Sequence, residues 1–110
     1  MYEFLSVYMT ASSRDEADKI ALALVEEKLA ACVNIFPGIL SVYKWAGTIR
    51  HSEECAMIAK IRSDQFDAFQ KRVKELHSYE CPCIVAVPVV AGSEEYLDWI
   101  RKETSGSSLK

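Results

Sequence analysis

Residues 31–50 read ACVNIFPGILSVYKWAGTIR, a pattern typical of a long β-hairpin. A Pro-Gly pair at 37–38 interrupts the outgoing strand, and the chain is expected to reverse at 45–47. The return strand is expected to span residues 48–62, and at about 3.3 Å per residue it would be roughly 50 Å long. A compact chain of 110 residues has a radius of gyration of only about 13 Å. We therefore expect the hairpin to extend beyond its own domain.

The outgoing strand of this hairpin is apolar on both faces. Strand alternation places Val33, Ile35, Ile39, Tyr43 and Trp45 on one face, and Cys32, Phe36, Leu40 and Val42 on the other. Two apolar faces require two neighbours, and an uncovered apolar edge favours aggregation. The hairpin therefore predicts a homo-oligomer. The alternative is that bulges at Pro37 and Gly38 divide it into short, ordinary strands.

Length and composition limit the class of protein. The chain has 110 residues, of which 50% are hydrophobic, and this predicts a single domain over residues 1–104 with a real core. The small and polar residues 105–110 are expected to form a disordered tail. The net charge of −3 comes from interspersed acids and bases without a basic stripe, so we expect no nucleic-acid partner.

Hydropathy and cysteine usage indicate the compartment. The chain shows neither a cationic start followed by an apolar run nor a segment of about 18 apolar residues. We therefore expect a soluble, cytoplasmic protein without a membrane partner. Its four cysteines are expected to be reduced thiols rather than two disulfides, and Cys32 and Cys55 are expected to be small core residues.

The remaining elements follow from apolar spacing. A first strand is expected over residues 4–9, and a helix over 14–30 begins after a capping box formed by Ser13 and Glu16. Further along we expect a helix over 63–77 with an N-cap at Ser63-Asp64, a strand over 83–91 with Pro88 at a bulge or edge, and a short helix after Gly92-Ser93.

This order of elements predicts the fold class. Strand, helix, two strands, helix and strand form the α+β, ferredoxin-like split βαβ sandwich, here with a long hairpin between the second and third strands and an extra C-terminal helix. Both main helices lie on one sheet face in this arrangement, so the other face needs cover. This again indicates that subunits pack sheet to sheet.

A series of short segments occurs in a fixed order along the chain. They are ACVNI (31–35), PG (37–38), SVYKW (41–45), HSYECP (77–82) and YLDWI (96–100), together with Gly47, Ile49 and Lys60. In this order and spacing they resemble the CutA divalent-cation tolerance family over residues 4–104. The resemblance implies a cytoplasmic ferredoxin-like homotrimer, similar in architecture to the trimeric PII signalling proteins and linked to copper and other divalent metals.

The chain departs from the family pattern at several positions relevant to metal binding. Some bacterial members carry a cysteine at the end of the first strand and paired histidines after the second helix, where this chain has Met9, Leu76 and His77. The family typically reads His-Pro-Tyr-Glu-x-Pro-Glu, whereas this chain has Ser78 in place of the first proline and Cys83 in place of the second glutamate. An acidic group is thus exchanged for a soft thiol.

His77, Cys81 and Cys83 form the first candidate site. They lie within seven residues, and imidazole with thiolates suits zinc or Cu(I), with Met9 as an additional soft thioether. In an extended segment both thiols point to the same side, which permits chelation. The alternative is a helix-ending histidine beside two packed cysteines. No cofactor is required for this interpretation, and copper or zinc are the candidate metals.

Tyr43, Trp45, Lys60, Tyr79 and Glu80 form the second candidate site. Two strand aromatics, a cation and an acid could converge in a groove between subunits, which would suit a small anionic or planar ligand. The alternative is that the two strand aromatics anchor an interface, Lys60 pairs with Glu80 and nothing binds.

The sequence contains no strong catalytic motif. No Gly-rich phosphate loop, nucleophile elbow or paired catalytic carboxylates occur, although His77 with Glu80 is a candidate acid–base pair. We therefore expect a non-enzymatic homotrimer that binds divalent or soft metal ions and contributes to metal tolerance. A PII-like small-ligand sensor, or an interaction scaffold that uses inter-subunit grooves, is the second hypothesis.

Overall fold

The computed structural model describes residues 2–105, so the tail predicted at 105–110 lies outside the described residues except for Ser105. The elements are β1 (Phe4–Ala11), α1 (Arg14–Glu26), β2 (Cys32–Trp45), β3 (Thr48–Arg62), the 3-10 helix η1 (Ser63–Gln65), α2 (Phe66–Leu76), β4 (Ile84–Pro88) and α3 (Glu94–Glu103). The strands form one antiparallel sheet in the order β2-β3-β1-β4. This confirms the predicted ferredoxin-like α+β fold.

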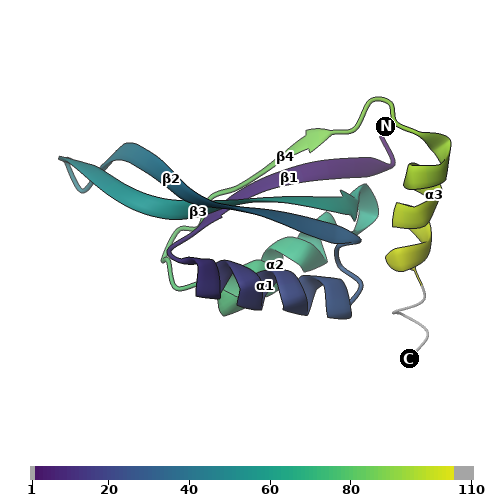
Figure 1. The fold of residues 1–110 in the computed structure, drawn as a ribbon, viewed down its shortest axis with the longest axis horizontal. Coiled ribbons are helices and arrows are strands. Elements are labelled where there is room, and N and C mark those ends of the chain that lie inside the picture. Colours follow the sequence, from purple (N-terminus) through teal and green to yellow (C-terminus); the bar gives the residue numbers. More distant parts are fainter. Residues whose placement is uncertain (1, 106–110) are drawn as a thin grey trace.

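Helices cover only one face of the sheet. α1 and α2 lie side by side against this face, and α3 lies at the sheet end away from the hairpin (Figure 1). The core between the layers contains Val7, Met9, Met57 and Ile61 from the strands and Ile20, Leu24, Phe69 and Val73 from the helices. None of the described helices has the length and apolar character needed to cross a membrane. We call the sheet face opposite α1 and α2 the open face.

The long hairpin extends well beyond the rest of the sheet. β1 pairs with β3 only from Cys55 to Arg62, so residues 39–54 form a two-stranded segment, which we call the ribbon. The chain reverses at Ala46 and Gly47, whose φ angles of 53° and 80° are typical of a tight type I′ turn. The ribbon projects from the rest of the domain (Figure 1), and the molecule measures 44 × 30 × 22 Å. The hairpin prediction is confirmed.

A bulge at 37–38 reverses the predicted faces of the ribbon. Between Phe36 and Ile39 the register shifts, because three steps along β2 match two steps along β3. The extra residue turns all later side chains to the opposite face of the sheet. Val33 and Ile35 pack toward the helices. The later residues predicted to share that face lie on the open face instead, namely Ile39, Tyr43 and Trp45.

α1 ends four residues before the end of the helix predicted over 14–30. Lys28 adopts a left-handed φ of 62°, and the Leu29 amide donates to the Leu24 carbonyl at 2.9 Å. The Lys28 amide also donates to the Val25 carbonyl at 3.1 Å. These bonds form a Schellman motif, in which glycine is the usual left-handed residue. Because this position is a lysine rather than a glycine, the sequence does not mark where the helix ends.

Two further boundaries differ from the prediction. The predicted N-cap at Ser63-Asp64 is wrong, because a 3-10 turn occupies these residues and the Ser63 hydroxyl donates to the Tyr2 carbonyl at 2.8 Å. β4 is shorter than the strand predicted over 83–91, and it ends at Pro88, which has no amide hydrogen to continue the ladder. Cys83 therefore belongs to the loop that precedes β4.

Candidate functional site

A groove on the open face brings together residues of both predicted sites. It has a volume of about 560 Å³ and lies where the ribbon meets the loop between α2 and β4, residues 77–83. Its lining consists of aromatic rings (Tyr8, Tyr43, Trp45, Tyr79), hydroxyls (Thr10, Ser41), charged groups (Arg50, Glu54, Glu80) and thiols (Cys81, Cys83). Tyr8 and Thr10 point away from the helices because they alternate with Val7 and Met9, which lie in the core.

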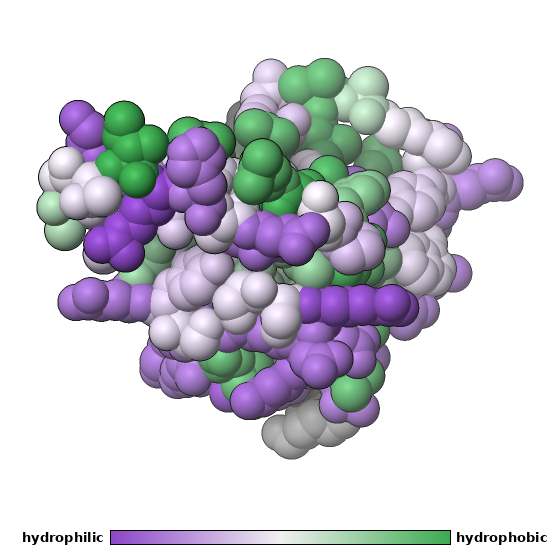
Figure 2. All heavy atoms as spheres, turned by 60° about the vertical axis from the view of Figure 1, so that its left-hand side comes forward, coloured by the Kyte–Doolittle hydropathy of each residue, from purple (hydrophilic) through white to green (hydrophobic). Residues whose placement is uncertain are grey.

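Apolar side chains are abundant on the same side of the molecule. Figure 2 shows hydrophobic residues gathered over its upper half, where the sheet lies, whereas the half that carries α1 and α2 is mostly hydrophilic. On the open face the strands leave Tyr8, Phe36, Tyr43, Trp45, Val85 and Val87 exposed, and Leu40, Val42 and Ile49 are exposed on the opposite face of the ribbon. Exposed apolar residues in such number mark an interaction surface.

Met9 and His77 do not join the predicted metal site. Met9 is 1% exposed and packs in the core on the helix side of the sheet. The His77 side chain is also 1% exposed, and both of its ring nitrogens are engaged. Nε2 donates to the Thr10 carbonyl at 2.7 Å, and Nδ1 accepts from the Tyr79 amide at 3.0 Å, which assigns the neutral Nε2–H tautomer. His77 therefore ties the loop to β1.

Of the four predicted metal ligands, only Cys81 and Cys83 line the groove. Across residues 2–105, no group of three or more His, Cys, Asp or Glu side chains is placed to hold one metal ion. All four cysteines are free thiols, with Cys81 exposed and Cys83 half-buried. The predicted set of His77, Cys81, Cys83 and Met9 is thus not assembled in this structure, because the histidine and the methionine have structural roles elsewhere.

Glu54 is a groove residue that the sequence analysis did not identify. It is only 8% exposed, and its Oε2 accepts a short hydrogen bond from the Tyr79 hydroxyl. Burial raises the pKa of Tyr79, and the Glu54 carboxylate raises it further. Burial also raises the pKa of the Cys83 thiol, with Glu54 again adding to the effect. A metal ion that binds Cys83 must therefore displace a proton.

The carboxylate of Glu16 anchors the same loop from α1. The Ser13 hydroxyl accepts from the Glu16 amide at 3.1 Å, as the predicted capping box requires. The Glu16 carboxylate, however, accepts from the amide and hydroxyl of Ser12 at 2.9 and 2.8 Å, and from the Ser78 amide at 2.7 Å. Partial burial raises the pKa of Glu16, but these hydrogen bonds outweigh it and lower the pKa to about 2.

This shift predicts that the fold loses stability in acid. Because the folded-state pKa lies below the ordinary value of 4.5, the stabilisation is present above pH 4.5 and is lost as the pH falls toward about 2. Urea unfolding across this range should show Glu16→Gln with lower stability at neutral pH and a flatter pH dependence than the wild type. Glu26→Gln, on the exposed side of the same helix, is the control. Equal slopes for the wild type and Glu16→Gln would refute this role.

The structure brings together the residues of the second candidate site, except for its lysine. Tyr43, Trp45, Tyr79 and Glu80 all line the groove, but Lys60 does not. Lys60 pairs with Cys32 and Ser6 across the strands, nearer to α3, and no ion pair in the described part of the chain joins it to Glu80. The cation that lines the groove is Arg50, which the sequence analysis did not single out.

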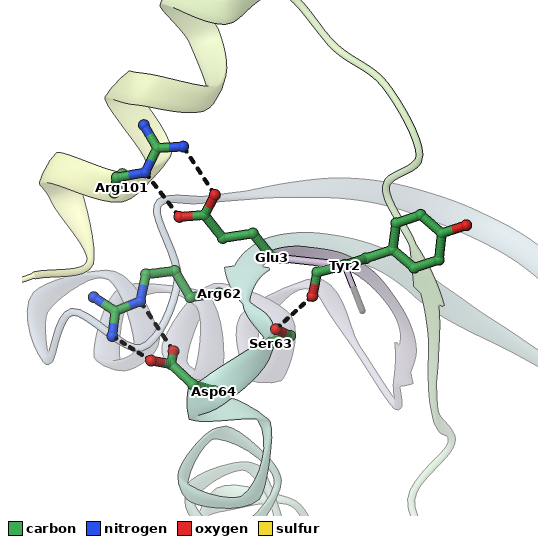
Figure 3. A pocket seen from close by; sticks show the side chains of 6 residues that line it. All are labelled: Tyr2, Glu3, Arg62, Ser63, Asp64 and Arg101. Carbon is green, nitrogen blue, oxygen red and sulfur yellow. Dashed lines mark hydrogen bonds and ion pairs between the residues drawn. The ribbon is translucent and has the colours of Figure 1, made fainter.

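A second cavity, of about 440 Å³, lies at the opposite end of the sheet. Figure 3 shows its two guanidinium groups turned toward carboxylates: Arg101 donates to Glu3 at 2.8 and 2.9 Å, and Arg62 donates to Asp64 at 3.0 and 2.9 Å. The hydrogen bond to Arg101 lowers the pKa of Glu3. Internal carboxylates therefore satisfy both arginines, and the Arg101–Glu3 pair attaches α3 to the residue that precedes β1.

Comparison with known proteins gives consistent matches. The family described as CutA1 divalent ion tolerance protein matches residues 5–103. The divalent-cation tolerance protein CutA of Archaeoglobus fulgidus is 52% identical over 94 residues, which cover 86% of this chain and 91% of that protein. Its counterpart from Thermus thermophilus is 47% identical over 98 residues, covering 89% and 95%.

Solved structures agree with these matches. The Thermus thermophilus protein has a TM-score of 0.90 at 45% identity, over 93% of this chain and 99% of that chain. CutA1 from Shewanella sp. SIB1 has a TM-score of 0.92 at 37% identity, over 96% and 98%. These relatives are named for divalent-cation tolerance or for CutA1, not for a catalytic activity, and an Archaeoglobus fulgidus structure is described as periplasmic. The chain belongs to the CutA1 divalent ion tolerance protein family.

Proposed function

We propose that this protein is a homotrimer that captures copper-class metal ions in the open-face groove and thereby contributes to metal tolerance without catalysis. The observation that carries the proposal is the position of Cys81 and Cys83, whose side chains line one groove on a surface rich in exposed apolar residues. Membership of a divalent ion tolerance family supports the physiological role. Four free thiols support a reducing, cytoplasmic location.

Self-association is supported by the shape and composition of the ribbon. It extends away from its own core, and Leu40 and Val42 on one face are 70% and 60% exposed. Tyr43 and Trp45 are exposed on the other face. Burial of one such aliphatic side chain contributes about 1.5–3 kcal/mol. A neighbouring copy that covers both faces of the ribbon would recover this energy.

Metal capture is supported by the donor chemistry of the groove. Thiolates are soft ligands that select Cu(I) and zinc over hard cations. Cys81 and Cys83 are separated by one residue and neither is fully buried, so both are accessible to an incoming ion. In this proposal the metal is cargo rather than a resident cofactor.

The test is a competition titration of Cu(I) into reduced protein with a chromogenic chelator. The wild type should bind copper, and the double variant Cys81→Ser/Cys83→Ser should bind at least about 100-fold more weakly, because both soft ligands are lost. Cys32→Ser is the matched control, since this thiol lies outside the groove and contacts the Tyr96 hydroxyl at 3.4 Å. Copper affinity that survives the double replacement would contradict the proposal.

A small-ligand sensor with PII-like architecture is the second candidate. The observation that favours it is Arg50, which pairs with Tyr43 across the ribbon and lines the groove beside aromatic rings. None of the ion pairs within residues 2–105 includes Arg50. A flat copper titration, together with a melting temperature that rises with organic anions, would favour this candidate over metal capture.

A further inference from the structure

Glu54 is a groove carboxylate that receives only one hydrogen bond from the described residues. Glu54 is 8% exposed, yet the hydrogen bonds of the described residues give its carboxylate a single donor, the Tyr79 hydroxyl. None of the ion pairs in the described part of the chain includes Glu54. Its second oxygen, Oε1, accepts no hydrogen bond from the described residues and is not among the buried oxygens that lack a partner, so it is open to the groove. Glu54 therefore has capacity for a positive partner.

Glu54 lies in the same groove as the two thiols. Glu54 is the last residue of the ribbon on β3, at the point where β1 begins to pair. Tyr79, Cys81 and Cys83 belong to one loop, and all three line the groove with Glu54.

We infer that Glu54 is the third protein ligand of a divalent ion bound by Cys81 and Cys83, and that it allows the groove to hold zinc-class ions in addition to Cu(I). This inference rests on the proposed function, because it assumes that the two thiols bind metal. In this structure the Tyr79 hydroxyl holds the carboxylate, and no three-ligand cluster is formed among the described residues. An arriving ion displaces the hydroxyl and the thiol protons and gains a carboxylate oxygen.

Coordination chemistry explains the choice of metal. Zinc accepts thiolates together with a carboxylate oxygen and completes a tetrahedral shell with water. Cu(I) is satisfied by thiolates, and a hard carboxylate oxygen adds little to its binding. Loss of Glu54 should therefore weaken zinc binding and leave copper binding unchanged. The difference between the two metals separates this inference from the proposal on which it rests.

The experiment measures Zn(II) and Cu(I) affinity by chelator competition for three variants of the reduced protein. Glu54→Gln should weaken Zn(II) binding at least about tenfold and leave Cu(I) binding within about twofold. Tyr79→Phe should strengthen Zn(II) binding roughly three- to tenfold, because the hydroxyl no longer competes for the carboxylate. Glu53→Gln removes the same charge from the neighbouring, exposed position on the opposite strand face and should change neither affinity.

Substitution of Co(II) for Zn(II) shows whether Glu54 is a ligand or only a nearby charge. A ligand role predicts a changed d–d absorption spectrum in Glu54→Gln, whereas a purely electrostatic role leaves the spectrum as in the wild type. The inference is overturned if Glu54→Gln binds Zn(II) like the wild type, or if it keeps the wild-type Co(II) spectrum. Circular dichroism of each metal-free variant confirms that it is folded before titration. A wild type that binds neither metal would reject the proposed function as well.

Discussion

Replacement of Leu40 and Val42 by glutamate is expected to convert the proposed trimer, at about three times the 12.4 kDa chain mass, into a monomer. These side chains are 70% and 60% exposed in the single chain, so the substitutions cost the isolated fold little. In a trimer the glutamates would place charges in three apolar contacts. Each contact would lose about 1.5–3 kcal/mol of burial free energy per side chain. It would also carry the cost of burying a carboxylate.

Sedimentation velocity over a dilution series measures this effect, and Leu22→Glu is the matched control. Leu22 is 56% exposed and lies on α1, away from the open face and the ribbon. The control should keep the wild-type mass. A doubly substituted ribbon that still sediments as a trimer would show that the ribbon is not the interface. A wild-type monomer at micromolar concentration would remove the self-association proposal entirely.

Replacement of Phe69 by alanine is expected to produce the largest loss of stability among single core substitutions on α2. Phe69 is fully buried between the helices and the sheet, and truncation of such a ring typically costs about 3–5 kcal/mol through lost burial and the cavity left behind. Because the stability of an oligomer depends on its concentration, wild type and variant must be unfolded at the same concentration.

Phe66→Ala provides the comparison for this prediction. Phe66 lies one turn earlier on α2, stacks on Phe69 with ring centroids 6.4 Å apart, and is only partly buried. Urea unfolding should therefore give Phe66→Ala a clearly smaller loss than Phe69→Ala. Equal losses for both variants would contradict the assigned core, in which Phe69 rather than Phe66 fills the space beneath the sheet.

Features encoded by local patterns could be predicted from the sequence. The apolar spacing of residues 63–77 predicted a helix, and the spacing of four residues between Phe69 and Val73 places both on one helix face, where they are fully buried. The alternating residues of the hairpin predicted its length. The tight turn at Ala46 and Gly47 lies at the predicted reversal point. These features depend on neighbours only a few residues apart, so the pattern contains the information needed.

Features set by distant contacts or by single-residue changes in register could not be predicted. One extra residue in the bulge turned Tyr43 and Trp45 to the open face, although alternation placed them with Val33. His77 is engaged by Thr10, a residue 67 positions away, which removes it from the groove. Glu54 is buried by the loop that contains Tyr79, 25 positions away. No local signal encodes these contacts.

X-ray absorption spectroscopy of the copper-loaded, reduced protein tests the central claim most directly, because it identifies the atoms bound to the metal. We predict a first shell dominated by sulfur, contributed by Cys81 and Cys83, and the loss of this shell in the double serine variant. A first shell of nitrogen scatterers with the multiple-scattering pattern of imidazole would show histidine coordination. That result would contradict the assignment of His77 to the anchoring of the loop and the location of metal capture in the groove.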